Sequence, residues 1–384
     1  MKVALIVGVF PADLSHLEAL ADSVDLIVYG TQRTLPWHHW SPQPPRQGRA
    51  RIFNPLVPTK RGQILWVYPG MRSVLDTDKP DIVHVISEPW GTLAVQATSW
   101  ARRNLDTALV VHGCDRIWWH GSAVEQKVRR VLAKRTLARA DGYAAETDAA
   151  VDKARASGLS PGAKTATIHT NPRNPEIFRP PASVDERNRA RETVGVPQNG
   201  VGIGFMARLI PAKGPIEFLD AVERVRKITP DAWAAMAGEG PLEEEVKVRC
   251  ADLGVHYLGS LPYPDRVADF YRSIDVFAVP SYTTPDWDEQ SPRALIESMM
   301  SGCVVVGSRC GALPEMIGDT GFVVEEKNVD SLVTGLSKAV EAYSDEALRK
   351  AAVERVTSKY SGAAIAGQLE DLWKSVRVRS YQDT

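Results

Sequence analysis

The chain has 384 residues, of which 44% are hydrophobic and 24% are charged, a composition typical of globular proteins and sufficient for two domains. The formal net charge of −1 and the absence of a recognised nucleic-acid-binding motif argue against a nucleic-acid partner. No stretch approaches the roughly 18 apolar residues of a membrane-spanning helix, and the four cysteines form no Cys-x-x-Cys motif. We therefore expect a cytoplasmic protein with free, buried thiols and no metal site.

Short β-branched runs alternate with amphipathic stretches through the first half of the chain. The apolar run before Pro11 is too short for a signal peptide and predicts a buried strand. Buried parallel strands are predicted at 3–9, 26–29, 82–86 and 108–112. Helices are predicted between them at 14–21, 93–102 and 122–139. This alternation indicates a doubly wound α/β domain.

A proline-rich segment at 171–181 interrupts this pattern. Its Asn-Pro and Pro-Pro pairs can continue neither a helix nor a central strand, so we predict a linker between two domains. The N-terminal domain is predicted at 1–178 and the C-terminal domain at 179–361. Charge also divides here, because residues 1–178 carry 22 Lys+Arg against 16 Asp+Glu, whereas residues 179–384 carry 24 against 31.

The alternation restarts after residue 200 and indicates a second doubly wound domain. Its strands are predicted at 201–206, 233–237, 255–258, 276–280 and 304–307. Ligands of such sheets bind beyond the carboxyl ends of the strands, and two such domains facing each other across a cleft would form a clamp.

Two cations lie in the loop that follows the strand at 201–206. Arg208 and Lys213 precede a helix that is predicted to begin near Pro215, so a diphosphate there would meet both charges and the helix N–H groups. The alternative is a pair of exposed cations in a surface loop. Residues 202–207 (GIGFMA) match the dinucleotide fingerprint, but their glycines lie inside the strand, so we expect no dinucleotide site.

Two glutamates lie on either side of the start of another helix. Ser291 is a good N-cap and Pro292 suits a first turn, so the helix is predicted to begin there. Glu289 then lies in the preceding loop. Glu297 lies on a largely apolar helix, where a carboxylate needs a partner such as a sugar hydroxyl, unless it faces solvent. A third loop of this kind, at 308–315, contains glycine and follows the next strand.

The first domain offers a histidine and an aspartate at the end of a strand. His112 and Asp115 lie at the carboxyl end of the strand at 108–112, where they suit substrate contact or proton transfer. A structural role for His112 is the alternative. His84, inside its own strand, is predicted to be a core histidine.

These residues together resemble the retaining glycosyltransferases of family 4, which have the GT-B fold, and the resemblance spans nearly the whole chain. Its most specific element is the Glu-x7-Glu signature at Glu289 and Glu297, followed by SMMSGCVVVGS and the GALPE loop. Residues 207–214 are similar to the family's Gly-Arg-Leu-x3-Lys-Gly element, with alanine in place of the first glycine. The linker ends in a family-like Phe-Arg-Pro, and the last helix, within about 362–384, is implied to cross back to the first domain.

The resemblance implies roles for the second domain. Arg208 and Lys213 are implied to bind the diphosphate of a nucleotide sugar and to stabilise its charge as it leaves. Glu297 is implied to hold the ribose hydroxyls. Glu289 is implied to bind the transferred sugar, together with Gln290 and Ser291. A uridine diphosphate sugar is the default donor and a guanosine diphosphate sugar is second. The implied reaction retains anomeric configuration by front-face attack and needs no cofactor or metal.

The resemblance also implies roles for the first domain, and one departure bears on the sugar. His112 is implied to lie over the transferred sugar, and Asp115 to lie on the acceptor side. The family's Gly-Phe-Gly after Glu289 is Gln-Ser-Pro here, and Pro292 has no N–H to offer a sugar hydroxyl. The sugar is therefore not assigned by analogy.

The acceptor is an unidentified hydroxyl compound: a glycan, a lipid-linked acceptor or a small molecule. Aromatic segments at 37–40 and 118–120 either hold an acceptor or pack a loop against the domain. A predicted helix carries six cations, at Lys127, Arg129, Arg130, Lys134, Arg135 and Arg139. Three alternatives remain for these cations: contact with anionic lipid at the inner membrane, contact with an anionic substrate, or exposure to solvent. The sequence does not indicate the oligomeric state.

A retaining glycosyltransferase is the function that the sequence favours, and two alternatives remain. A sugar-nucleotide epimerase would need its own acid–base pair, and the Glu-x7-Glu signature argues against it. A non-catalytic sugar-nucleotide-binding subunit is allowed by the altered Gln290–Pro292 segment. The presence of Arg208, Lys213 and His112 together with both glutamates argues against that second alternative.

Overall fold

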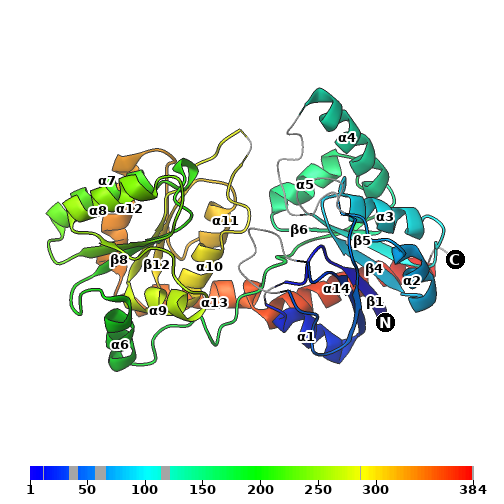
Figure 1. The fold of residues 1–384 in the computed structure, drawn as a ribbon, viewed down its shortest axis with the longest axis horizontal. Coiled ribbons are helices and arrows are strands. Elements are labelled where there is room, and N and C mark those ends of the chain that lie inside the picture. The colour runs from blue at the N-terminus through cyan, green and yellow to red at the C-terminus, as the bar shows by residue number, and fades with distance from the viewer. Residues whose placement is uncertain (12, 34–41, 57–65, 114–121, 286, 383–384) are drawn as a thin grey trace. The chain divides into compact units, whose positions relative to one another are not determined.

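The chain folds into two compact units, each with its own parallel sheet (Figure 1). The computed structural model describes residues 1–11, 13–33, 42–56, 66–113, 122–285 and 287–382. Unit 1 comprises Met1–Pro172 and Gly362–Thr384, and unit 2 comprises Arg173–Ser361.

The described residues of unit 1 form a seven-stranded sheet in the order β3-β2-β1-β4-β5-β6-β7, with every neighbouring pair parallel. The strands are β1 (Lys2–Ile6), β2 (Asp25–Gly30), β3 (Arg49–Ile52), β4 (Ile82–Ile86), β5 (Ala108–Gly113), β6 (Gly142–Ala145) and β7 (Lys164–Thr167). The inner strands β1, β2, β4 and β5 are rich in Val, Ile and Leu because a parallel sheet is buried on both faces.

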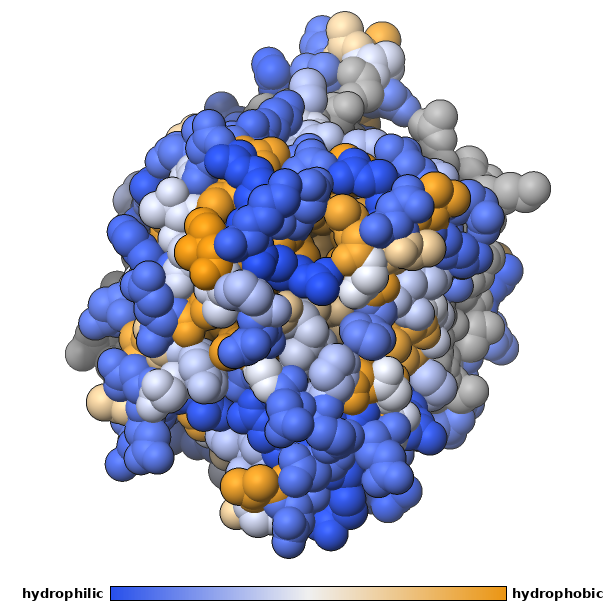
Figure 2. Space-filling view, turned by 90° about the vertical axis from the view of Figure 1, so that its left-hand side faces the viewer, coloured by the Kyte–Doolittle hydropathy of each residue, from blue (hydrophilic) through white to orange (hydrophobic). Residues whose placement is uncertain are grey.

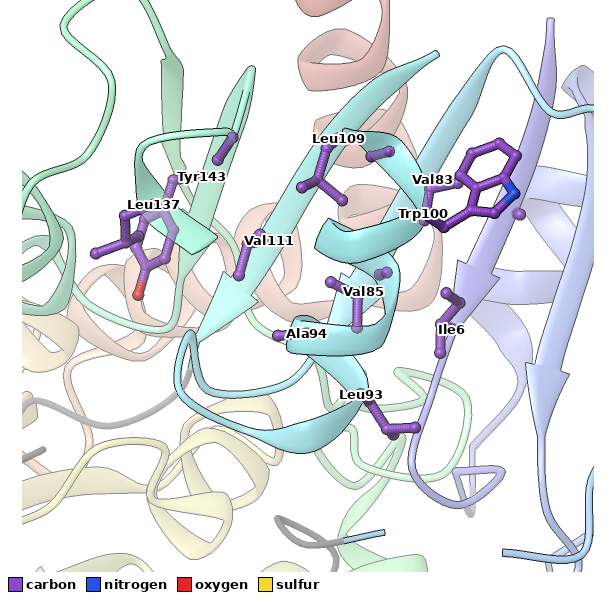
Figure 3. Packing of buried hydrophobic residues seen from close by; sticks show 14 of the residues in the cluster. Ile6, Val83, Val85, Leu93, Ala94, Trp100, Leu109, Val111, Leu137 and Tyr143 are labelled. Carbon is purple, nitrogen blue, oxygen red and sulfur yellow. The ribbon is translucent and has the colours of Figure 1, made fainter. Parts of the chain in front are cut away.

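Alternate side chains of these strands enter two separate cores. In β1, Ala4 and Ile6 join one core, whereas Val3 and Leu5 join the other. Side chains of α3 lie over β4 and β5 in the first core (Figure 3). The helices of unit 1 are α1 (Ser15–Ser23), α2 (Met71–Asp78), α3 (Thr92–Ala101), α4 (Ala123–Leu137), α5 (Asp148–Ala156) and α14 (Gly362–Gln382). The second core contains Trp373 of α14, which is fully buried.

The described residues of unit 2 form a six-stranded parallel sheet in the order β10-β9-β8-β11-β12-β13. The strands are β8 (Gly202–Met206), β9 (Trp233–Ala237), β10 (His256–Tyr257), β11 (Val276–Val279), β12 (Val304–Ser308) and β13 (Phe322–Val324). Counted from the first strand of each unit, both sheets contain the Rossmann order 3-2-1-4-5-6, to which the first sheet adds β7 at its edge. The prediction of two Rossmann-like, doubly wound α/β domains is confirmed.

Helices cover both faces of the second sheet. They are α6 (Val184–Val194), α7 (Pro215–Ile228), α8 (Glu243–Leu253), α9 (Asp265–Ser273), α10 (Arg293–Met300), α11 (Leu313–Ile317), α12 (Val329–Ala342) and α13 (Glu346–Tyr360). The glycines of the fingerprint-like segment serve this packing. A Cβ on Gly202 would lie 2.5 Å from the Trp233 ring, and one on Gly204 would lie 2.3 Å from the Ile274 side chain. Close packing against β8 therefore explains them.

The first crossover between the units lies before the boundary that the sequence predicts at 178. The N–H of Arg173 donates to the carbonyl of Tyr360 at 2.8 Å, and Phe178 is buried in a core of unit 2. Residues 173–178 therefore belong to unit 2, because their backbone and apolar side chains pack there.

Figure 2 shows a face of the molecule that is mainly hydrophilic, with hydrophobic residues in small separate groups. Ion pairs along helices contribute to the polar surface of unit 2, such as Lys227–Glu223 in α7 and Lys247–Glu243 in α8, each at 2.9 Å. Within the described ranges, no helix combines the length and the apolar character needed to cross a bilayer.

Candidate functional site

The strand order of unit 2 reverses between β8 and β11, and ligands of such sheets bind beyond the carboxyl ends of the strands at this point. The loop after β8 spans 207–214, and the loop after β11 spans 280–292. Hydrogen bonds connect these two loops to each other and to the loop after β12. The three loops that the sequence singles out therefore meet at one edge of the sheet.

Lys213 is positioned by a tight turn against the end of β11. It ends a single 3-10 turn, Pro211–Lys213, and α7 begins two residues later at Pro215. Gly214 adopts φ +69°, and a Cβ there would lie 2.4 Å from the carbonyl oxygen of Pro280. Glycine at this position thus lets the turn and the helix N-terminus approach β11 closely.

Glu289 is buried, and a cation and a hydroxyl satisfy its carboxylate. Lys213 Nζ lies 2.6 Å from Glu289 Oε1, and Ser281 Oγ donates to the same oxygen at 2.6 Å. The Lys213 side chain stays 22% exposed, with its ammonium 4.4 Å from the centre of the Trp287 ring. A partly exposed cation held in place by a buried carboxylate is suited to bind an anion at this edge.

The loop after β12 holds the backbone of Glu289 in place. The N–H of Ala312 donates to the carbonyl of Glu289 at 2.7 Å. Gly311 adopts φ +55°, and a Cβ there would lie only 2.0 Å from that carbonyl oxygen. Only glycine allows this approach, so the glycine of the third loop positions the glutamate of the second.

Arg208 lies on a backbone that the loop after β9 fixes. The N–H of Leu209 donates to the carbonyl of Glu239 at 2.8 Å, and a Cβ on Gly238 would lie 1.9 Å from the carbonyl oxygen of Ala207. The Arg208 side chain is exposed and forms no ion pair with any residue that the structure describes. Its charge is therefore available to an anionic ligand.

Gln290 and Ser291 are half-buried in the turn before α10. The side-chain amide of Gln290 donates to the carboxylate of Asp288. The predicted N-cap at Ser291 is wrong, because α10 begins at Arg293 and its N-cap is Pro292. The ψ of Pro292 is 92°, so this residue is extended and precedes the helix instead of forming its first turn.

Glu297 is 3% exposed, and its main partner is an arginine far away in the sequence. Arg173 Nε lies 2.9 Å from Glu297 Oε1, and the Tyr271 hydroxyl donates to Oε2 at 3.4 Å. Burial raises the pKa of Glu297, while the Arg173 guanidinium opposes that shift. The partner that this carboxylate needs is thus supplied within unit 2, and its contact with ribose stays a prediction.

In unit 1, His112 is buried beside a second histidine. Its Nε2 lies 2.8 Å from the carbonyl oxygen of Ile168, and its ring stacks on that of His84 with centres 5.4 Å apart. The indole N–H of Trp373 donates to Nδ1 of His84 at 3.0 Å. His84 is therefore a core histidine, as predicted, whereas His112 Nδ1 is buried with no hydrogen-bond partner among the described residues.

Some predicted residues lie outside the described residues: Asp115 and the aromatic segments at 37–40 and 118–120. Other residues of interest carry no motif in the sequence. Arg173 reaches Glu297, Trp287 lies beside Lys213, and Glu146 pairs with a histidine at the edge of unit 1. Arg173 and Glu146 pair with residues far away in the sequence, so no local pattern could have identified them. Trp287 could have been singled out because it lies two residues before the predicted site residue Glu289.

Two family models together match most of the chain. The model described as "Glycosyl transferase 4-like domain" matches residues 13–171, and "Glycosyl transferases group 1" matches residues 186–357. HepE of Anabaena, solved in complex with UDP, superposes with a TM-score of 0.69 at 19% identity, covering 98% of this chain and 100% of that one. This likeness confirms the predicted GT-B fold class, with two Rossmann-like domains.

Two relatives have named activities. The D-inositol 3-phosphate glycosyltransferase of Corynebacterium kroppenstedtii is 28% identical over 282 residues, which cover 66% of this chain and 57% of that one. The GDP-mannose-dependent alpha-(1-6)-phosphatidylinositol monomannoside mannosyltransferase of Mycolicibacterium smegmatis is 31% identical over 159 residues, which cover 40% of this chain and 41% of that one. The matches thus span less than two thirds of the length of either relative.

Proposed function

We infer the function from family and site together: the chain belongs to the family 4 glycosyltransferases, and we propose that it transfers a sugar from a nucleotide diphosphate sugar to a hydroxyl acceptor. The observation that carries this proposal is the Lys213–Glu289 contact at the strand-order reversal of unit 2. It places a partly exposed cation and an acceptor of hydroxyl hydrogens side by side, which suits a phosphate next to a sugar.

In the proposed mechanism, the protein stabilises charge on the leaving diphosphate. Lys213 and Arg208 supply positive charge, and the N-terminus of the 14-residue helix α7 supplies further N–H groups beside Gly214. Glu289 accepts hydrogen bonds from hydroxyls of the transferred sugar. Within unit 1, we propose His112 as a residue that binds a sugar hydroxyl. We propose retention of anomeric configuration by front-face attack, with these cations and dipoles taking the role that a metal has in other transferases.

The donor is tested by thermal unfolding of the purified protein with UDP, GDP, UDP-glucose and GDP-mannose, with EDTA present. A ligand at a hundred times its dissociation constant adds about 2.7 kcal/mol to stability, so one nucleotide series should raise the melting temperature clearly. Lys213→Ala should abolish this rise. If none of the four ligands shifts a cooperative transition, the donor site is wrongly assigned.

Turnover distinguishes the enzyme from a binding subunit. In the presence of EDTA, the nucleotide sugar that binds in the thermal test should release its nucleoside diphosphate. NMR of the product should show the same anomeric configuration as in the donor. Inversion would contradict front-face attack, and a requirement for added Mg²⁺ would contradict the metal-free mechanism. A donor that binds and stays intact with every acceptor would favour the non-catalytic alternative.

For the acceptor, we propose an inositol phosphate headgroup, free or lipid-linked, because the two relatives are named for such acceptors. Product formation with inositol 3-phosphate and with phosphatidylinositol in vesicles tests both forms. Transfer to neither, with donor turnover intact, would refute this acceptor class without affecting the donor site.

The exposed face of α4 supports a lipid-linked acceptor. Val124, Val128 and Val131 lie one turn apart on this helix and are 72%, 51% and 53% exposed. Four exposed cations flank this valine row: Lys127, Arg130, Lys134 and Arg135. The first-turn acid Glu125 is engaged with Ser122 in a capping box. We propose that this face contacts anionic lipid, since a second copy of the helix would bring like charges together.

Co-sedimentation with vesicles of phosphatidylcholine, with and without phosphatidylglycerol, tests this contact. Binding should require the anionic lipid, and Lys127→Ala with Arg130→Ala should weaken it by about 2 kcal/mol, or roughly thirtyfold. A second variant carries serine at the three α4 valines, Val124, Val128 and Val131. Its matched control carries Val184→Ser and Val248→Ser, at two exposed valines of unit 2. Equal binding by neutral vesicles, or none by either, would refute the contact.

A further inference from the structure

A buried carboxylate and a buried imidazole lie at the carboxyl edge of the unit 1 sheet, and the mechanism above uses neither. Glu146 directly follows β6, and His169 lies two residues after β7. Their side chains are 2% and 5% exposed, and Glu146 Oε2 lies 2.7 Å from His169 Nδ1. Because burying a carboxylate costs free energy even when it is hydrogen-bonded, stability alone is a weak explanation for this contact.

Glu146 fixes the chain segment 168–170. Its Oε1 accepts a hydrogen bond from the N–H of Thr170 at 3.0 Å and another from the Thr170 hydroxyl at 2.5 Å. On the other side of the segment, the N–H of Ile168 donates to the carbonyl of Ala145 at 2.8 Å. The carbonyl group of Ile168 is therefore held from both sides, by β6 and by the Glu146 side chain.

The Ile168 carbonyl determines which nitrogen of His112 carries the proton. It lies 2.8 Å from His112 Nε2, and a carbonyl oxygen can only accept, so Nε2 must be the protonated nitrogen of the neutral ring. Nδ1 then keeps its lone pair. It is buried, and no residue in the described ranges donates to it. A fixed imidazole acceptor of this kind matches a hydroxyl group of a ligand and does not match an anion.

We propose that Glu146 is a positioning residue: through His169 and Thr170 it holds the Ile168 carbonyl, which locks His112 as the Nε2–H tautomer and presents Nδ1 to a sugar hydroxyl. The identity of the ligand as a sugar rests on the proposed function. The tautomer itself follows from the contacts of unit 1 alone, so it can be tested without turnover.

The surroundings keep His112 neutral, as this arrangement requires. Burial lowers the pKa of His112; the Glu146 carboxylate opposes this shift and His169 adds to it. Burial also lowers the pKa of the neighbouring His84 and brings that of His16 to about 4. His112 Nδ1 is thus an acceptor on a neutral ring, with the Glu146 carboxylate as the charged group beside it.

The first test is ¹⁵N NMR of histidine-labelled protein, with the His112 ring assigned from the signal lost in His112→Gln. The wild type should show protonated Nε2 and unprotonated Nδ1 at pH 7. In Glu146→Gln and, to a smaller degree, in Thr170→Val, the two ring nitrogens should shift towards each other as both tautomers become populated. A protonated Nδ1 in the wild type, or an unchanged tautomer in both variants, would overturn the proposal.

The second test compares binding with turnover of UDP-glucose and GDP-mannose. Glu146→Gln should lower kcat/KM on the donor that is used by at least about tenfold, while affinity for the sugar-free nucleoside diphosphate stays unchanged. Asp148→Asn is the matched control, since it neutralises an exposed carboxylate that binds Thr167 on the same edge. An equal loss in this control would overturn the assignment. Absence of turnover in the wild type would refute the proposed function and leave the NMR result to decide the tautomer.

Discussion

Replacing Arg173 by Met leaves the Glu297 carboxylate buried without its cationic partner at 2.9 Å, and should destabilise unit 2. The two side chains are 5% and 4% exposed, so water cannot replace the lost cation. Breaking a buried pair in this way costs about 3–5 kcal/mol. For a unit of this size, each kcal/mol lowers the melting temperature by about 2–4 °C, so we expect a fall of about 6–20 °C.

The loss should depend on pH, because burial already raises the pKa of Glu297 above its ordinary value of 4.5 and removal of Arg173 raises it further. Between 4.5 and the raised value, the folded variant binds more protons than the unfolded chain does, so its stability falls as pH rises. Below 4.5 the carboxyl is protonated in both states and the charge penalty disappears. The variant should therefore lose most stability at neutral pH and regain part of it near pH 4.5.

Calorimetry of the wild type, Arg173→Met and the double variant Arg173→Met with Glu297→Leu checks this reasoning. The double variant should recover most of the loss, because an apolar pair of similar volume carries no buried charge. Isothermal titration with the nucleoside diphosphate then shows whether Glu297 also contributes to donor affinity. A single variant that melts within about 2 °C of the wild type at pH 7 would refute the account of Glu297 as a buried, paired carboxylate.

Three further changes have expected outcomes. Lys213→Ala should lower kcat by about a hundredfold or more if the ammonium stabilises the leaving diphosphate, and unchanged turnover of a folded variant would exclude that role. Gly311→Ala should lower both melting temperature and donor affinity, measured in one thermal-shift series, because its Cβ would lie 2.0 Å from the Glu289 carbonyl oxygen. Although burial opposes it, pairing with His169 and Thr170 lowers the pKa of Glu146 to about 2. The stability that the charged Glu146 contributes is thus fully present above its ordinary pKa of 4.5 and is lost as pH falls towards 2. The stability of Glu146→Gln should therefore fall less steeply with decreasing pH than that of the wild type, as measured by acid unfolding.

The fold was predictable from sequence where strands are rich in β-branched residues. The predicted strands at 82–86 and 233–237 coincide with β4 and β9. Three strands of unit 1 escaped prediction: β3, β6 and β7, with the sequences RARI, GYAA and KTAT. Alanine, glycine and charged residues have low strand propensity, so pairing with neighbouring strands and packing against the two cores hold these segments in the sheet. Tertiary pairing, which a single sequence does not display, decides such cases.

The candidate site was predictable in position and less so in its contacts. The spacing of Glu289 and Glu297 makes them look equivalent, yet one binds Lys213 at an exposed edge and the other binds Arg173 in the interior. The partners lie 76 and 124 positions away along the chain, so local patterns could not separate the two environments. The difference matters chemically, because Lys213 stays partly exposed to a ligand while the Arg173 pair is closed off from solvent.

What the sequence shows least is how closely backbones approach one another at the site. Gly214 permits contact with the end of β11, and Gly311 permits contact with Glu289. In a sequence, each is one of 28 glycines, many of which lie in ordinary turns. Their role follows from the positive φ of each combined with a carbonyl oxygen where a Cβ would be. If these approaches place Glu289 and the start of α7 for a donor, the alanine variants at both glycines should impair donor binding together, although neither glycine touches the donor through a side chain.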